Sequence, residues 1–146
     1  MCIRDRSLPR RLDLVPPVFP RAQSRRAGVE PMFRLVSVAV APGGDVVVLS
    51  SVGEVIALGA DGAARRLARL PSGHYHRTHM TVGPAGDVFV SSGFHIRDLY
   101  RISSAGAVAV IARKLGDPGG IAVDAAGALY VAEGAYHRII RLVPTP

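Results

Sequence analysis

Short runs of β-branched and aliphatic residues, separated by glycine-containing turns, recur along the chain from about residue 35 onward. In three segments two such runs are joined by a turn with glycine, which is the pattern of a β-hairpin. These segments are 38–48, 80–90 and 121–131. Their matching valines, Val40, Val82 and Val123, are spaced by 42 and then 41 residues. The chain therefore contains an internal repeat of nearly constant length.

Further strands are predicted after each hairpin. The third strands are expected at 54–58, 98–102 and 138–142. In the first two repeats another glycine turn leads into a fourth strand. The fourth strands are expected at 65–70 and 107–112. Four strands in a repeat of this length are typical of one blade of a β-propeller.

A helical repeat of similar length is the competing architecture. It requires stretches of about 10–15 residues with apolar residues at positions i, i+3, i+4 and i+7. No such stretch is present, and Gly or Pro interrupts the chain almost every ten residues. We therefore predict an all-β propeller fold of about three four-stranded blades, the third incomplete. The expected blades are 35–70, 79–112 and 120–142.

The N-terminal part differs from the repeats in charge. Of the net charge of +7, residues 1–34 carry +5 and residues 35–146 only +2. We expect residues 1–34 to be a disordered Pro/Arg-rich leader, whose first six residues look like a translated sequencing scar. A basic tail of this kind binds phosphate without reading sequence, so no specific nucleic-acid partner is predicted. If the native N-terminus is missing, the sequence does not indicate whether the protein is cytoplasmic, periplasmic or secreted. The excess of Arg over Lys suggests a bacterial gene.

Composition excludes several classes of protein. No window approaches the roughly 18 apolar residues that a membrane-spanning helix needs. The single cysteine, Cys2, excludes a disulfide framework and a cysteine-based zinc site. No Ser lies in a G-x-S-x-G context and no phosphate-binding glycine loop is present. Hydrolysis by a serine nucleophile therefore has no support.

The repeat resembles a known family pattern. Its consensus is close to G-[IM]-[AT]-V-x-x-x-G-x-[LVF]-[YFV]-V followed by R-I-x-R-L. This is similar to NHL-type and related six-bladed β-propellers, including TolB-like and SMP-30/gluconolactonase-like proteins and the soluble glucose/sorbosone dehydrogenases. The resemblance covers residues 35–142 and implies a six-bladed ring. It points to an architecture rather than an activity, because such propellers include enzymes and pure binding modules.

Three blades do not close such a ring. They leave strand edges and one blade face uncovered, which favours association. We expect the chain to be a fragment whose partners are the remaining blades of the same protein. The alternative is that two copies associate to complete six blades.

The blade pattern divides the connections between two ends of each sheet. Connections from strand one to two and from three to four share one end, here called the turn end; they read as plain structural turns. The other connections share the loop end, and four of the five histidines lie there. Chemically active residues on loops at one end of a rigid scaffold are typical of a binding or catalytic site. We predict that the loop end binds a small molecule or a protein through Arg77, His95, Arg97, Asp117, Tyr136 and His137. Arg101 and Arg141, in the third strands, are expected to face solvent or bridge blades.

A more specific alternative comes from one segment. Gly73–Thr78, followed by Gly83–Asp87 and Ser91-Ser92-Gly93, is similar to the part of sorbosone and soluble glucose dehydrogenases that carries a catalytic histidine. In that family the histidine takes a proton from the sugar while hydride passes to pyrroloquinoline quinone (PQQ). Imidazole, with an unperturbed pKa of about 6.5, suits this role. The resemblance implies His74 as the base, with His76 as the second choice, Arg77 facing cofactor or substrate, and PQQ and calcium as cofactors.

Two departures from that family place this alternative second. The turn reads G-P-A-G rather than G-P-D-G, and the insertion that carries the cofactor-binding residues is missing. The first prediction is therefore a ligand- or partner-binding scaffold.

The histidines also raise the question of a metal. His74 and His76 in an extended segment place both imidazoles on one side, with His79 or His95 as candidates for a third ligand. No carboxylate lies in this cluster, and we predict no metal site. The SMP-30-like lactonases use a Glu/Asn/Asp calcium site, and this chain contains no Asn. The resemblance therefore does not supply a complete lactonase site.

Overall fold

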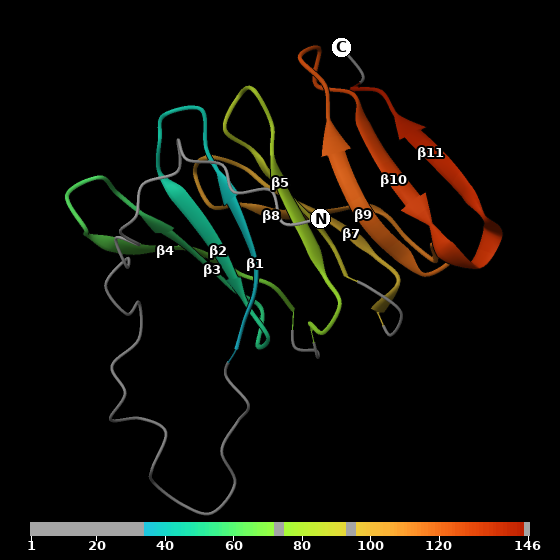
Figure 1. Ribbon diagram of the computed structural model, residues 1–146, viewed down its shortest axis with the longest axis horizontal. Helices are drawn as coiled ribbons and strands as arrows, with labels where there is room; N and C mark the ends of the chain where they lie inside the picture. The colour runs from blue at the N-terminus through green and yellow to red at the C-terminus, as the bar shows by residue number, and fades with distance from the viewer. Residues whose placement is uncertain (1–33, 72–74, 93–95, 145–146) are drawn as a thin grey trace, which may run out of the picture.

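A computed structural model describes residues 34–71, 75–92 and 96–144, and these form three antiparallel β-sheets (Figure 1). Apart from Arg34, the predicted leader lies outside the described residues. The first two sheets have four strands and the third has three, which confirms the all-β prediction with an incomplete third blade.

Each sheet is a meander in which consecutive strands are hydrogen-bonded neighbours. The first sheet consists of β1 (Leu35–Val40), β2 (Val46–Ser50), β3 (Glu54–Leu58) and β4 (Ala64–Arg69). The second consists of β5 (His79–Val82), β6 (Val88–Ser91), β7 (Leu99–Ile102) and β8 (Val108–Ala112). The third consists of β9 (Pro118–Val123), β10 (Leu129–Glu133) and β11 (Arg138–Leu142), with the one-turn helix η2 (Gly134–Tyr136) before β11.

The middle strands of the first sheet are apolar at consecutive positions because their side chains are buried on both faces of that sheet. In β2, Val47 and Leu49 belong to the core between the first two sheets, whereas Val48 packs on the opposite face. Successive side chains of a strand point to opposite faces, so burial on both sides requires a continuous apolar run. The outer strand β4 is largely exposed and carries charged residues.

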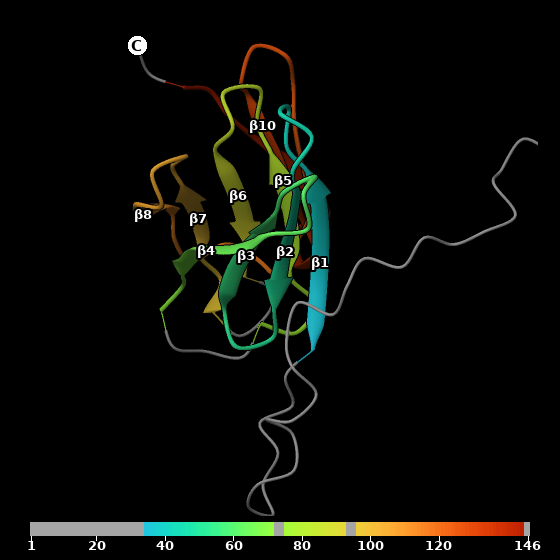
Figure 2. The same cartoon turned by 90° about the vertical axis from the view of Figure 1, so that its left-hand side faces the viewer.

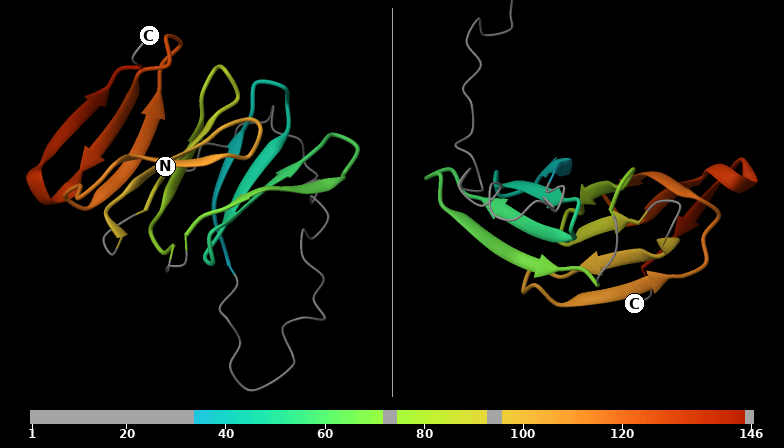
Figure 3. Two further views of the ribbon diagram at one scale, coloured as in Figure 1. Left: turned by 180° about the vertical axis from the view of Figure 1, so that it is seen from behind. Right: turned by 90° about the horizontal axis from the view of Figure 1, so that it is seen from below.

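The three sheets follow one another along a row, with their first strands side by side. Strand β5 contacts both β1 and β9 (Figure 1). Figure 2 shows β1 and β5 toward one edge of the molecule and β8 at the other, and Figure 3 shows the same succession from behind and below. Hydrogen bonds join neighbouring sheets near the first strands: Met80 N–H donates to Ser37 Oγ at 3.1 Å, and Ser91 Oγ donates to the Gly119 carbonyl at 2.7 Å.

Two buried clusters fill the space between the sheets. The larger one joins the first and second sheets and includes Leu49, Val90 and Ile102. The smaller one joins the second and third sheets through Leu99, Leu129 and others. Each sheet is thus held by side chains of its neighbour, which is how propeller blades are stabilised. In the described residues no helix is both long and apolar enough to cross a membrane.

Candidate functional site

The strand order assigns the connections to two ends, as the pattern predicts. The β2–β3, β6–β7 and β10–β11 connections lie at one end of the sheets together with β4–β5 and β8–β9 (Figure 1). This is the loop end. The β1–β2, β5–β6 and β9–β10 hairpin turns lie at the opposite, turn end. Predicted site residues His74 and His95 belong to the loop-end connections but lie outside the described residues.

Strained backbone is concentrated at the loop end. Five non-glycine residues in the described part have left-handed φ angles between +51° and +62°, and all lie in loop-end connections. They are Arg77, Arg97, Lys114, Asp117 and His137. The hairpin turns of the turn end use glycine for the same conformation, for example Gly44 and Gly86. A left-handed non-glycine residue costs about 1–3 kcal/mol and is characteristic of functional sites. Four of the five were predicted as binding residues.

Two of these residues occupy a position where the first blade has glycine. Strand pairing makes Leu58, Ile102 and Leu142 equivalent, because each pairs with the first residue of its second strand. Five residues before them stand Gly53, Arg97 and His137, all with positive φ. The second and third blades therefore keep a charged or titratable side chain at a position that the first blade fills with glycine.

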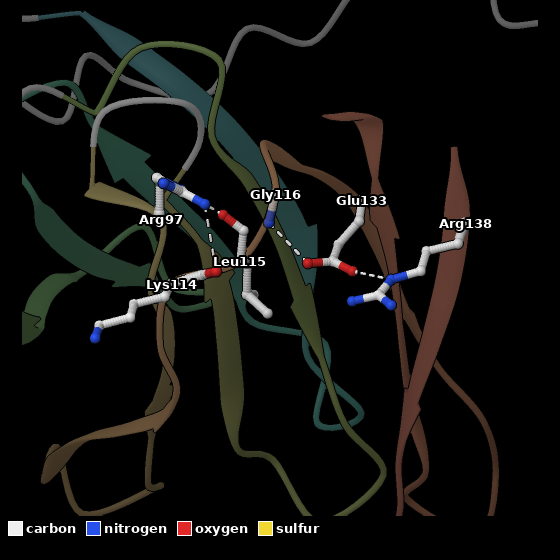
Figure 4. A network of polar contacts seen from close by, with 6 residues as sticks. All are labelled: Arg97, Lys114, Leu115, Gly116, Glu133 and Arg138. Atoms are coloured by element: carbon white, nitrogen blue, oxygen red, sulfur yellow. Dashed lines mark hydrogen bonds and ion pairs between the residues drawn. The ribbon is translucent and has the colours of Figure 1, made fainter. Parts of the chain in front are cut away.

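Arg97 ties two loop-end connections together (Figure 4). Its Nε donates to the Leu115 carbonyl at 2.6 Å and its Nη2 to the Lys114 carbonyl at 3.4 Å. The Leu115 N–H in turn donates to the Arg97 carbonyl at 2.9 Å. Arg97 was predicted to bind a ligand, and in the structure it positions the β8–β9 connection.

A buried carboxylate continues this network into the third sheet (Figure 4). Glu133 is only 2% exposed. Its Oε1 accepts the Gly116 N–H at 2.7 Å and its Oε2 accepts Arg138 Nε at 2.5 Å. These two donors, the Gly116 amide first, hold the pKa of Glu133 below its ordinary value. The sequence analysis missed Glu133, although it is an acidic residue at the end of a second strand, where the first blade has a serine.

Asp117, Tyr136 and His137 are brought together where the β8–β9 connection meets η2. The Asp117 carbonyl accepts the Gly134 N–H at 3.0 Å. The Tyr136 ring lies against Gly116, where an added Cβ would be only 2.3 Å from it. The Arg138 guanidinium carbon lies 5.1 Å from the Tyr136 ring centre, within reach of a cation–π interaction. Tyr136 is 54% exposed, so part of this ring is available to a ligand.

The β4–β5 connection is held by a residue that the sequence analysis did not single out. Tyr75 is fully buried; its N–H donates to the Ser51 carbonyl at 3.1 Å and its hydroxyl to the Pro71 carbonyl. Burial raises the pKa of the Tyr75 phenol. Its neighbours His76 and Arg77, both predicted site residues, are exposed beside this anchor.

A cavity lies at the other end of the molecule. It has a volume of about 710 Å³ and lies between the turn ends of the second and third sheets. Its lining includes Asp87, Phe89, Arg101, Ile111, Leu129 and Arg141. The turns of this end were predicted to be purely structural, and the arginines to face solvent or bridge blades. Within residues 34–71, 75–92 and 96–144, no three His, Cys, Asp or Glu side chains gather closely enough to hold a metal ion.

No family model and no curated protein sequence matches this chain. Solved structures do match its fold. Virginiamycin B lyase from Staphylococcus aureus has a TM-score of 0.59 and 19% identity, over 75% of this chain and 41% of that one. A catalytically inactive histidine-to-alanine variant of this lyase, solved with quinupristin, has a TM-score of 0.59 and 19% identity, over 77% and 42%. A gluconolactonase from Xanthomonas campestris has a TM-score of 0.53 and 22% identity, over 69% and 35%.

At these identities the likeness concerns the fold. Together with the three meander sheets, it shows that the chain is made of β-propeller blades. The chain spans less than half the length of these structures.

Proposed function

We propose that residues 35–146 contribute propeller blades, near 35–70, 79–112 and 120–142, and that their loop end binds a small molecule or a protein. The observation that carries this proposal is the left-handed backbone of Arg77, Arg97, Lys114, Asp117 and His137. Glycine would adopt this conformation without strain, so the presence of charged or titratable residues there favours a role for their side chains.

The chemistry of the loop end favours a ligand with oxygen acceptors and a flat face. Between the second and third blades, Lys114 and His137 offer donors, and Asp117 offers an acceptor. Tyr136 offers an exposed ring on which an apolar or sugar face can stack. Arg97 and Glu133 hold the two connections that carry these groups.

The test is a thermal-shift and calorimetric titration against quinupristin, gluconolactone, glucose and sorbosone. The first two are suggested by the similar structures and the sugars by the dehydrogenase alternative. Binding should be lost in the double variant Asp117→Gly/His137→Gly, which relieves strain and should leave the fold intact. A control variant, Arg66→Gln in the first blade, should bind like the wild-type chain. Equal binding by the double variant would refute a loop-end site.

A second candidate is a PQQ-dependent sugar dehydrogenase with His74 or His76 as general base. Its support is the exposed position of His76 and Arg77 next to the buried anchor Tyr75. The described residues contain no cluster of three His, Cys, Asp or Glu side chains that could hold the calcium ion. Dye reduction with glucose or sorbosone in the presence of PQQ and calcium tests it. Activity that disappears in either His74→Ala or His76→Ala would support this candidate and identify the base, and absence of activity would remove it.

A further inference from the structure

The turn-end cavity has the size of a small-molecule site. Its volume of about 710 Å³ falls within the range of roughly 300–1,000 Å³ that is usual for ligand pockets. One wall is the β5–β6 turn with Phe89 behind it, and the opposite wall is the β9–β10 turn with Leu129 behind it. Ile111 on β8 and Leu142 on β11 extend the apolar lining. The cavity is therefore lined by two neighbouring blades rather than by one loop.

Two arginines stand at equivalent positions in this cavity. Arg101 on β7 pairs with Phe89 in register, and Arg141 on β11 pairs with Tyr130. Both line the cavity. Arg101 is neutralised, because its Nε donates to Asp87 Oδ2 at 2.7 Å.

Arg141 lacks such a carboxylate. The position equivalent to Asp87, directly after the glycine of the hairpin turn, is Ala128 in the third blade. No carboxylate of the described residues lies within ion-pair distance of Arg141, whose guanidinium carbon lies 5.8 Å from the Tyr130 ring centre. An arginine with no ion pair beside an apolar surface can bind an anion.

Asp124, an acidic residue that Arg141 influences electrostatically, is already hydrogen-bonded within its own turn. Asp124 Oδ1 accepts the N–H groups of Ala126 and Ala128, each at 2.9 Å, and Oδ2 accepts the Tyr130 hydroxyl at 3.2 Å. The hydrogen bond from the Ala128 amide lowers the pKa of Asp124 most. The charge of Arg141 lowers it least. Asp124 therefore shapes the turn and leaves the donors of Arg141 open to a ligand.

We propose that this cavity binds a small carboxylate with an aromatic or aliphatic body. The carboxylate pairs with Arg141, and the body lies on Phe89, Ile111 and Leu129. The site lies at the end of the blades opposite the proposed loop-end site and does not depend on it.

The probe is 2-naphthoate, titrated into the whole chain by isothermal calorimetry. The wild-type chain should bind it, and Arg141→Gln should weaken binding about tenfold or more, because a charge-assisted hydrogen-bond pair is lost. The neutral alcohol 2-naphthalenemethanol should bind the wild-type chain and Arg141→Gln equally and weakly. Arg141 is exposed, so the substitution should not affect folding, which circular dichroism checks.

Three further variants test whether naphthoate binds in this cavity rather than elsewhere on the chain. Arg66→Gln removes another exposed strand arginine, in the first blade, and should leave naphthoate binding unchanged. Ala125→Phe adds bulk to the exposed lining without altering charge and should also weaken binding. The double variant Asp117→Gly/His137→Gly should bind naphthoate like the wild-type chain, because it alters only the loop end. The turn-end and loop-end proposals can therefore fail independently. No binding by the wild-type chain, or equal binding by Arg141→Gln, would overturn the proposal.

Discussion

At the scale of single residues, the loop end differs from the turn end in which side chains adopt the left-handed conformation. Glycine takes it in the turns of the turn end, and charged or titratable residues take it in the loops except at Gly53 in the first blade. The two clearest cases have different local roles. Arg97 uses its guanidinium to bind two carbonyl groups, whereas His137 is exposed and its backbone N–H closes η2 onto Gly134. A strained residue whose side chain makes no hydrogen bond or ion pair within the described residues, as at His137, is therefore a better candidate for ligand binding than one whose side chain holds the backbone, as at Arg97.

This contrast predicts that substitution by glycine changes the stability of the fold differently at the two positions. His137→Gly should raise the free energy of unfolding by about 1 kcal/mol, because it removes left-handed strain. Arg97→Gly relieves the same strain but removes the bonds to Leu115 and Lys114, so it should not stabilise the chain. Urea denaturation of both variants and the wild-type chain measures the difference. Destabilisation by His137→Gly would show that the imidazole serves the fold.

Glu133 predicts a pH dependence of stability. Its folded-state pKa lies below the ordinary value of 4.5, so its ionised form stabilises the folded chain. That contribution is fully present above about pH 4.5 and is lost as the pH falls through the lower folded-state value. Glu133→Gln should therefore lower stability at pH 7 and show a smaller further loss between pH 5 and pH 3 than the wild-type chain. Unfolding curves at pH 7, 5, 4 and 3 test this; parallel losses in both proteins would contradict it.

At the scale of strands and connections, hairpin periodicity was enough to predict the sheets but not what holds the loops. A glycine turn between two apolar runs sets the register, and the same register recurs in all three sheets. Tyr75 and Glu133 were not found, because their partners Ser51 and Gly116 lie 24 and 17 residues away and belong to other connections. The cavity was missed because it exists only where the turns of two blades face each other. The loop-end candidates Asp117, Tyr136 and His137 were predicted from their position in the repeat alone, and their role as binding residues stays a prediction.

Tyr75 should be the main anchor of the β4–β5 connection. Tyr75→Ala should lower the free energy of unfolding by about 3–5 kcal/mol, because a fully buried aromatic side chain leaves a cavity. Tyr75→Phe should cost only about 1 kcal/mol, the contribution of one hydrogen bond. The exposed Tyr136 provides the control, since Tyr136→Ala should cost much less than Tyr75→Ala. Chemical denaturation compares the three variants, and equal costs at Tyr75 and Tyr136 would contradict the assignment of an anchor.

At the scale of the whole molecule, the sheets at the two ends of the row expose apolar side chains on their outer sides, here called the uncovered sides, although the middle strands β2 and β3 of the first sheet are buried on that face. On β1, Val38 and Val40 are 63% and 66% exposed, and they point to the same face of the strand. On β11, Ile139 is 73% exposed, and the strand has no neighbour on its outer side among the described residues. The second sheet lies between two others and has apolar cores on both sides. The two uncovered sides are where a further blade or a second copy of the chain can pack.

These surfaces predict that the isolated chain self-associates as its concentration rises. Burial of each valine contributes about 1.5–3 kcal/mol, so the double variant Val38→Lys/Val40→Lys should raise the dissociation constant by more than tenfold. Sedimentation velocity over a range of concentrations measures it. Val108→Lys, on the outer strand β8, is the matched control because Val108 is 38% exposed and lies away from both uncovered sides. A wild-type chain that stays monomeric, or a double variant that associates as strongly, would show that these sides do not mediate association.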